Sequence, residues 1–285
     1  MYVITGITGQ VGGVVARALL AQQKKVRAVV RDAEKGKVWA RQGCDVALAQ
    51  LRDMAALTQA FTGAEAVFVL LPPLFDPQPD MAEARASIDS LNSALQAARP
   101  QRVVCLSTIG AQATKPNLLS ALGLLERTLA DLPIPTTFLR AGWFMENFLW
   151  DVGSALENGV ISSYLQPLDR AIPMVGTVDI GRLAADLLQS TWSGSQVVEL
   201  EGPARYSPAQ AASTFSRLIE RPVHAQAVAR DTWEPRFLAQ GMTNPLPRMQ
   251  MLDGFNEGWI EFEGTPQKGE TTLDTVLQGL LKRHG

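Results

Sequence analysis

The sequence is poor in cysteine, histidine and tyrosine. Its 285 residues include two cysteines, two histidines and three tyrosines. The cysteines, Cys44 and Cys105, form no CxxC pair and sit in or beside apolar runs, which predicts buried, reduced thiols. The histidines, His224 and His284, lie far apart and give no metal-ligand spacing. We therefore expect no metal site and a cytoplasmic protein.

An excess of charge of one sign and long apolar runs are also missing. Lys and Arg number 26 against 28 Asp and Glu, a formal net charge of −2, which disfavours a nucleic-acid surface. The longest apolar runs, such as 66–71, have strand length and fall far short of the roughly 20 residues of a membrane helix. The chain opens on an apolar run at 2–4, without the pattern of a secretory signal. Neither nucleic acid nor a membrane is an expected partner.

What the sequence does contain is a regular alternation of strand-like and helix-like segments over its first 140 residues. Six short apolar runs predict strands, at 3–4, 26–30, 44–48, 66–71, 103–106 and 136–139. Five helices are expected between them, at 11–20, 33–42, after an N-cap at Asp53, at about 81–98 and at about 118–131. This alternation is typical of a Rossmann-type, doubly wound parallel sheet, whose ligands bind beyond the carboxyl ends of the strands.

The second half of the chain is less regular. Its expected elements are a helix at 144–157, a helix ending at Gln189 with Asp179 or a neighbour as its cap, a strand at 197–200 and a helix opening at Ser207-Pro208. The stretch 231–268, rich in Trp, Phe, Met, Pro and Gly, suggests a loop-and-helix cap over a pocket. We therefore divide this α/β protein into a Rossmann domain at 1–142 and a smaller substrate-binding α/β subdomain at 143–285, interleaved with it.

A glycine-rich turn joins the first expected strand to the first expected helix. It reads TGITGQVG over 5–12, with glycines three apart. Gly6 suits a tight turn after the strand, Gly9 lets the backbone approach a pyrophosphate, and Gly12 lets the helix pack closely on the sheet. The exposed amides and the helix dipole favour an anion. A strand before the turn and a helix after it favour a dinucleotide site over a purely structural turn.

The end of the second expected strand bears on which dinucleotide binds. An NAD site usually has a carboxylate there, whereas this sequence continues Val30-Arg31-Asp32. The planar guanidinium of Arg31 can hold a 2′-phosphate, and Lys35, one helical turn further on, adds a second cation. NADP(H) is therefore the expected cofactor, although Asp32 complicates this interpretation, and Arg31 and Asp32 can also be merely solvated.

With these motifs in place, the sequence resembles the NmrA-like atypical short-chain dehydrogenases/reductases. The resemblance is carried by the turn at 5–13, by Val30-Arg31-Asp32, and by FLRAGWFMENF at 138–148. The last segment is similar to the sixth-strand segment of quinone oxidoreductases, triphenylmethane dye reductases and ergot-alkaloid reductases of that family. The resemblance covers nearly the whole chain and is clearest over 1–150.

The resemblance implies a set of site residues. The pyrophosphate and the nicotinamide side would be surrounded by Gly6, Thr8, Gly9, Gln10 and Val11. The 2′-phosphate would be held by Arg31, and the adenine would lie near Leu51. The path toward the nicotinamide would be lined by Leu71, Pro72 and Ser107. The substrate would be faced by Trp143, Phe144, Asn147 and Phe148, although the aromatic rings among them are equally compatible with core packing.

Ordinary members of the wider superfamily use a Tyr-x-x-x-Lys pair on the fifth helix, with the tyrosine as proton donor. Here the tyrosines, with the residue four positions on, are Tyr2 (Gly6), Tyr164 (Leu168) and Tyr206 (Gln210). Carbonyl reduction that relies on a positioned general acid is therefore disfavoured. Hydride transfer itself needs only proximity and orientation. An iminium or triarylmethyl cation needs no proton at the moment of transfer, and a quinone can take one from water.

Two functions of different classes follow. The first is an NADPH-dependent reductase of a flat, apolar acceptor, such as a quinone, an imine or iminium, or a conjugated compound. The alternative is a non-catalytic NADP(H)-sensing regulatory protein that acts through a protein partner. A substrate cavity over the nicotinamide separates the two, because a sensor needs none. Other chemistry on the same scaffold, such as epimerisation, is a third option.

No catalytic residue is assigned from the sequence. Candidate acids in the second half, without any geometric support, are Glu146, Asp151, Tyr164 and Asp179. The sequence does not fix the oligomeric state, and a homodimer stays open. It also does not show whether the segment 231–268 closes over a ligand.

Overall fold

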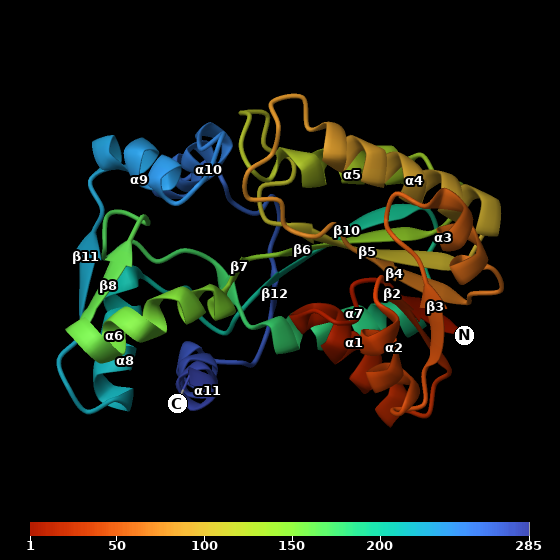
Figure 1. The fold of residues 1–285 in the computed structure, drawn as a ribbon, viewed down its shortest axis with the longest axis horizontal. Helices are drawn as coiled ribbons and strands as arrows, with labels where there is room; N and C mark the ends of the chain where they lie inside the picture. Colours follow the sequence, from red (N-terminus) through yellow and green to blue (C-terminus); the bar gives the residue numbers. More distant parts are fainter. Residues whose placement is uncertain (285) are drawn as a thin grey trace.

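Eight parallel strands form the central sheet (Figure 1). In order across the sheet they are β12 (Gln267–Lys268), β10 (Ser195–Glu201), β6 (Thr136–Ala141), β5 (Arg102–Thr108), β4 (Ala66–Val69), β1 (Tyr2–Ile4), β2 (Val26–Val30) and β3 (Asp45–Leu48). The computed structural model describes residues 1–284. The chain starts at β1, builds outward to β3, and then returns to the other side of β1 with β4. This reversal between β1 and β4 is the switch point at which a doubly wound sheet offers a crevice to a ligand.

The expected Rossmann-type sheet is confirmed, and it is larger than expected. All six strands predicted in the first half belong to it. The two additional strands come from the second half of the chain: β10 pairs with β6 over Ser195–Leu200, and β12 pairs with the end of β10. The neighbours of these two strands are distant in sequence, so periodicity alone could not place them.

Two layers of helices cover the sheet (Figure 1). One layer contains α1 (Gln10–Ala21), α2 (Ala33–Ala40) and α7 (Thr177–Gln189), and the other contains α3 (Met54–Phe61), α4 (Ala82–Ala98) and α5 (Ser120–Ala130). The first layer buries Val15 and Leu19 of α1 beside Leu188 of α7. The second buries Phe61 and Leu91. Each fully buried side chain of this size contributes about 1.5–3 kcal/mol, so both layers are held firmly on the sheet.

Close helix packing fixes the beginning of α1. Gly181 of α7 faces α1, where a Cβ atom would lie 2.5 Å from Cβ of Val14. Gly12 faces the preceding turn, where a Cβ atom would lie 2.4 Å from the carbonyl oxygen of Gly6. Both approaches require glycine, because nonbonded carbon contacts this short are repulsive. The N-terminus of α1 therefore sits rigidly at the switch point.

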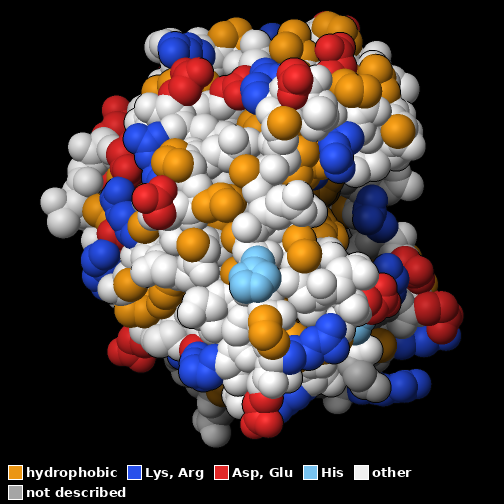
Figure 2. Space-filling view, turned by 90° about the vertical axis from the view of Figure 1, so that its left-hand side faces the viewer, with side chains coloured by type: hydrophobic (Ala, Val, Ile, Leu, Met, Phe, Trp, Pro, Cys, Tyr) orange, Lys and Arg blue, Asp and Glu red, His pale blue; other side chains and the backbone are white. Residues whose placement is uncertain are grey.

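The remaining elements form a second body, which we call the cap lobe (Figure 1). Its members are β7 (Trp143–Phe144), the 3-10 helix η1 (Met145–Asp151), α6 (Val152–Asn158), β8 (Val160–Ser163), β9 (Met174–Val175), α8 (Pro208–Leu218), β11 (His224–Ala227), the 3-10 helix η2 (Arg230–Thr232), α9 (Trp233–Ala239), α10 (Leu246–Glu257) and α11 (Leu273–His284). A separate apolar core, with Phe215, Trp233 and Phe237 fully buried, holds it together. Figure 2 shows that acidic, basic and apolar side chains intermingle on its outer face.

Two local expectations in this half differ from the structure. The helix predicted at 144–157 is a short strand, a 3-10 helix and then α6. Residues three apart align on a 3-10 helix, so Met145 and Phe148 share its buried side while Trp150 is exposed. The N-cap of α7 is Gly176 and not Asp179, whose carboxylate instead accepts hydrogen bonds from Thr271 N (2.8 Å) and Oγ1 (2.7 Å).

The caps expected at Asp53 and Ser207 are confirmed. Asp53 accepts a hydrogen bond from Ala56 N at 2.9 Å, and Ser207 forms a reciprocal capping box with Gln210. No helix within residues 1–284 combines the length and the apolar character that crossing a bilayer requires.

Candidate functional site

The glycine turn has the geometry of an anion-binding turn. Gly6 adopts a positive φ of 60°, and Gly9 N–H donates to the carbonyl of Gly6 at 2.9 Å. Gly9 is the N-cap of α1, no side chain caps this helix, and its first turn carries no acidic residue. The first amides of α1 are therefore available to an external acceptor at the positive end of the helix dipole. A pyrophosphate fits this arrangement.

The predicted residues of the turn differ in exposure. Thr8, Gly9 and Gln10 are exposed and can approach a ligand directly. Val11 is 4% exposed and its side chain packs in the sheet core, so only its backbone remains to serve a cofactor.

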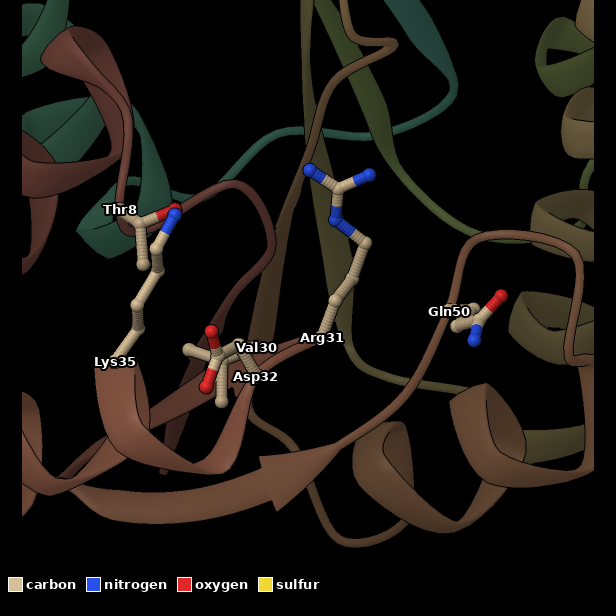
Figure 3. A pocket seen from close by; sticks show the side chains of 6 residues that line it. All are labelled: Thr8, Val30, Arg31, Asp32, Lys35 and Gln50. Atoms are coloured by element: carbon tan, nitrogen blue, oxygen red, sulfur yellow. The ribbon is translucent and has the colours of Figure 1, made fainter.

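A cavity of about 330 Å³ lies between the turn and the end of β2. It is lined by Thr8, Val30, Arg31, Asp32, Lys35 and Gln50 (Figure 3). Figure 3 shows Lys35 extending toward Thr8 and the guanidinium of Arg31 directed away from Asp32. The structure thus brings together Arg31 and Lys35, the two cations that the sequence singled out.

Asp32 has a separate task in this cavity. Its Oδ1 accepts a hydrogen bond from Glu34 N at 2.8 Å and caps α2. Within residues 1–284, neither Arg31 nor Lys35 forms an ion pair with an acidic side chain. Two cations without acidic partners beside an anion-binding turn fit a 2′-phosphate, which carries nearly two negative charges.

The other predicted cofactor residues lie along the carboxyl edge of the sheet. Leu71 and Pro72 follow β4, and Leu71 is half-buried while Pro72 is exposed. Leu51 is half-buried after β3 and packs against the core beneath α3 and α4. Ser107 is buried near the end of β5. All four stand at strand ends that face the crevice, where a dinucleotide would extend.

Ser107 belongs to a buried polar network with Glu126 of α5 and Arg140 of β6. Its Oγ donates a short hydrogen bond to Oε1 of Glu126. Arg140 donates two parallel hydrogen bonds to the same carboxylate, from Nε to Oε1 at 2.9 Å and from Nη2 to Oε2 at 2.7 Å. It also forms an ion pair with Glu263. Burial lowers the pKa of Arg140, but its hydrogen bonds to Glu126 and Glu263 have the larger combined effect and raise the pKa. Both carboxylate oxygens of Glu126 are therefore committed to neighbours.

The residues expected to face a substrate divide into two groups. Trp143, Phe144 and Asn147 are half-buried, and the ring of Trp143 meets that of Phe255 edge-on, with centroids 5.1 Å apart. Phe148 is 8% exposed and packs on Phe215 in the core of the cap lobe. Phe148 therefore contributes to the core, while the other three keep surface that a ligand can reach.

Two further aromatic residues, which the sequence did not single out, lie at the same edge. Phe75 follows β4 and is 43% exposed, and Trp150 lies in the last turn of η1 and is 64% exposed. Their rings meet edge-to-face with centroids 5.9 Å apart. Exposed aromatic residues follow no periodicity, so only the structure could pair these two.

Asp76 ties the loop after β4 to the cap lobe. Its carboxylate accepts hydrogen bonds from Thr243 N and Oγ1, both at 2.8 Å, and from Asn244 N at 2.6 Å. The backbone hydrogen bonds of Thr243 and Asn244 lower the pKa of Asp76, so the contact is charged at neutral pH. The loop carrying Phe75 is thereby fixed beside the linker between α9 and α10.

Comparison with known proteins decides the family. A model of the NmrA-like family matches residues 2–261. This chain belongs to the NmrA-like family. The resemblance stated from the sequence is thus confirmed.

Individual relatives match almost end to end. The NAD(P)H azoreductase of Xenophilus azovorans is 27% identical over 278 residues, covering 97% of this chain and 91% of the azoreductase. Quinone oxidoreductase 2 of Escherichia coli (strain K12) is 27% identical over 251 residues, covering 87% and 85%. The Citrobacter sp. triphenylmethane reductase complexed with NADP(H) superposes with a TM-score of 0.85 at 20% identity, covering 99% of this chain and 100% of that one. The last likeness shows the shared fold.

The candidate acids of this NmrA-like chain have different surroundings. Oε1 of Glu146 accepts bonds from Thr177 N (2.9 Å) and Oγ1 (2.6 Å), so Glu146, like Asp179, is engaged at the first turn of α7. Tyr164 packs against two aromatic residues of α9. Burial raises the pKa of Asp151 to about 7. Within residues 1–284, no three His, Cys, Asp or Glu side chains gather as a metal ion would require.

Helix α5 of this NmrA-like chain carries no tyrosine and no lysine. Its polar inward residue is Glu126, which is 8% exposed and held by Arg140 and Ser107. Both oxygens of this carboxylate are engaged by Arg140 and Ser107 and are turned away from any ligand-donating role on α5 by these bonds. The helix that carries the proton donor in the wider superfamily therefore has a structural ion pair here.

Proposed function

We propose that this NmrA-like protein is an NADPH-dependent oxidoreductase that transfers hydride to a flat, apolar acceptor, such as a quinone, an imine or iminium, or a conjugated compound. The observation that carries the proposal is the pair Arg31 and Lys35 beside the glycine turn, neither of which has an acidic partner in the described part of the chain. Three relatives support it by name, since they are an azoreductase, a quinone oxidoreductase and a triphenylmethane reductase. All three names denote reduction of an extended conjugated system.

The cofactor would be held along the carboxyl edge of the sheet. The backbone of Gly6, Thr8, Gly9, Gln10 and Val11 would bind the pyrophosphate. Arg31 and Lys35 would bind the 2′-phosphate and select NADPH over NADH. Leu51 would contact the adenine, and Leu71, Pro72 and Ser107 would line the way to the nicotinamide. When bound, NADPH supplies the hydride.

The acceptor would lie against the aromatic residues at the mouth of the crevice. Trp143, Phe144 and Asn147 offer half-buried surface there, and Phe75 and Trp150 add exposed rings. Phe148 would support this wall from the core. Stacking of this kind suits planar molecules and excludes water from one of their faces.

The lack of a tyrosine or lysine on α5 restricts the acceptor. The carboxylate of Glu126 is already bound on both oxygens, and α5 offers no tyrosine. A quinone fits this limitation, because water can protonate the reduced oxygen after hydride arrives. A cationic acceptor needs no proton at that moment.

The test is NADPH oxidation, followed at 340 nm, with a panel containing 1,4-naphthoquinone, an azo dye, a triarylmethane dye and a cyclic imine. We expect turnover with at least one class. In the Arg31→Ala variant the KM for NADPH should rise about 10- to 100-fold, the loss of one or two charge-assisted hydrogen bonds, while the KM for NADH should stay nearly constant.

Arg41→Ala is the matched control, because Arg41 is an exposed arginine at the end of α2 that does not line the cavity. Equal loss of NADPH affinity in both variants would contradict the role of Arg31. Tight NADPH binding without turnover of any acceptor would favour the non-catalytic NADP(H) sensor instead.

A further inference from the structure

Arg248 of α10 is a half-buried cation without an acidic partner. Its guanidinium carbon lies 4.5 Å from the ring centroid of Phe237 and 6.0 Å from that of Phe75. Its one side-chain hydrogen bond within residues 1–284 runs from Nη1 to the sulfur of Met242, at 3.7 Å. Within residues 1–284 no carboxylate pairs with it. Its surroundings are therefore aromatic and apolar.

The other sheltered arginines of the described chain are all neutralised. Arg27 pairs with Asp45 at 2.7 Å, Arg102 with Glu65 at 3.4 Å, and Arg140 with Glu126 at 2.7 Å. Withdrawing a cation from water is costly unless an anion compensates, and burial accordingly lowers the pKa of Arg248. A sheltered arginine without such compensation points to an anion that a ligand supplies.

The position of Arg248 connects it to the acceptor side of the crevice. Phe75, which it faces, follows β4 and also contacts Trp150 of η1. The start of α10 docks on the loop after β5, where Leu118 N–H donates to the carbonyl of Pro247 at 2.9 Å. Strands β4 and β5 end at the edge where Ser107 lies. Arg248 therefore lies next to Phe75, beyond the ends of these two strands.

We propose that Arg248 binds an anionic group, a carboxylate or sulfonate, carried by the aromatic acceptor. The inference rests on the proposed reductase function and narrows its substrate class to negatively charged planar compounds. The ring of Phe237 supports one face of the guanidinium, and its only hydrogen bond within residues 1–284 is the weak one from Nη1 to the sulfur of Met242, which an oxyanion in a planar, two-point contact would replace. The same charge disfavours cationic acceptors.

The experiment compares 1,2-naphthoquinone-4-sulfonate with 1,2-naphthoquinone, which differ in one anionic group. In the Arg248→Leu variant we expect the KM for the sulfonate to rise about 10- to 100-fold and the KM for the neutral quinone to change less than about 3-fold. Arg248→Lys should recover part of the affinity, because it keeps the charge and loses the fork. Arg236→Leu, an exposed arginine on α9, is the matched control.

Binding without turnover provides the second measurement. Calorimetric titration with naphthalene-2-sulfonate, at saturating NADP⁺ so that Arg31 is occupied, should give a dissociation constant about 10- to 100-fold weaker in Arg248→Leu. Equal effects on both quinones, or unchanged sulfonate binding in a folded variant, would overturn the proposal. If no acceptor is reduced but sulfonate binding still depends on Arg248, the reductase function fails and the anion site stands.

Discussion

On the cofactor side of the crevice, the groups that would bind the ligand come from two short stretches, the turn at 5–12 and the residues 31–35. On the acceptor side they come from segments far apart in the chain, such as Phe75, Trp150 and Arg248. The cofactor side uses backbone amides and exposed cations, and the acceptor side uses rings and one sheltered cation. Residues close together in the sequence are enough to bind a dinucleotide, which is always the same molecule. Binding an acceptor of particular shape and charge requires a surface that only folding brings together.

The largest expected effect concerns Glu126 of α5, which holds Ser107 of β5 and Arg140 of β6. Glu126→Ala leaves Arg140 and Ser107 buried without their shared partner. Breaking a buried ion pair from one side costs about 3–5 kcal/mol. Because Arg140 keeps Glu263 as a partner, the free energy of unfolding in urea should fall by about 3 kcal/mol, the lower end of that range. Asp45→Ala, which removes the more exposed partner of Arg27, is the control and should cost about 0–1 kcal/mol. Similar losses of unfolding free energy in the two variants would contradict a special contribution of the Glu126 network to stability.

The next largest effect is a loss of NADPH affinity, and it tests the cofactor side alone. In Gly12→Val the new side chain would meet the carbonyl oxygen of Gly6, where even a Cβ atom would lie at 2.4 Å. We expect NADPH binding, measured by fluorescence titration, to weaken by about 100-fold, or about 2.7 kcal/mol. Gly279→Ala, where a Cβ atom meets nothing within 4 Å, should leave binding unchanged. If Gly12→Val binds NADPH like the parent protein, the turn does not carry the pyrophosphate.

The smallest effect concerns Asp151 on the acceptor side. Burial raises its pKa to about 7 in the folded protein, above the ordinary value of 3.8. The folded state then holds its proton more tightly than the unfolded chain, so stability falls as pH rises from about 4 to about 7. A difference of one in pKa is worth about 1.4 kcal/mol, and the carboxyl keeps some contact with water, so Asp151→Asn should gain about 1–2 kcal/mol at pH 8.

Urea unfolding at pH 5 and pH 8 measures this gain. Asp169→Asn, at an exposed aspartate, is the control and should leave the difference between the two pH values unchanged. A gain in Asp151→Asn that is equally large at pH 5 would mean that packing, and not ionisation, is responsible.

The same comparison explains what the sequence could predict. The turn at Gly6 and the N-caps at Asp53 and Ser207 depend on residues within a few positions of one another, and the sequence predicts each of them. The position of β10 beside β6 depends on pairing over about sixty residues, which periodicity does not encode.

The acceptor side shows the same limit more strongly. Asp76 meets Thr243 and Asn244 across 167 and 168 positions. In the sequence, Arg248 looks like any charged residue on a helix, and only the surrounding rings reveal that it is sheltered and unpaired. Phe148 illustrates the converse, since a motif placed it at the substrate and the 3-10 geometry of η1 turned it toward the core.

The path of the chain through the sheet also limits how such proteins can be recombined. The chain leaves the sheet after β6, returns for α7 and β10, leaves again, returns for β12, and ends in the cap lobe with α11. The cap lobe is therefore built from several separate segments of the sequence, so a single insertion could not add it and a single deletion could not remove it. A chimera that borrows a relative's acceptor side must exchange the loop after β4 that carries Phe75, the segments 143–175 and 202–266, and α11 together. A single crossover would join Phe75 and Trp150 of one parent to Arg248 of another.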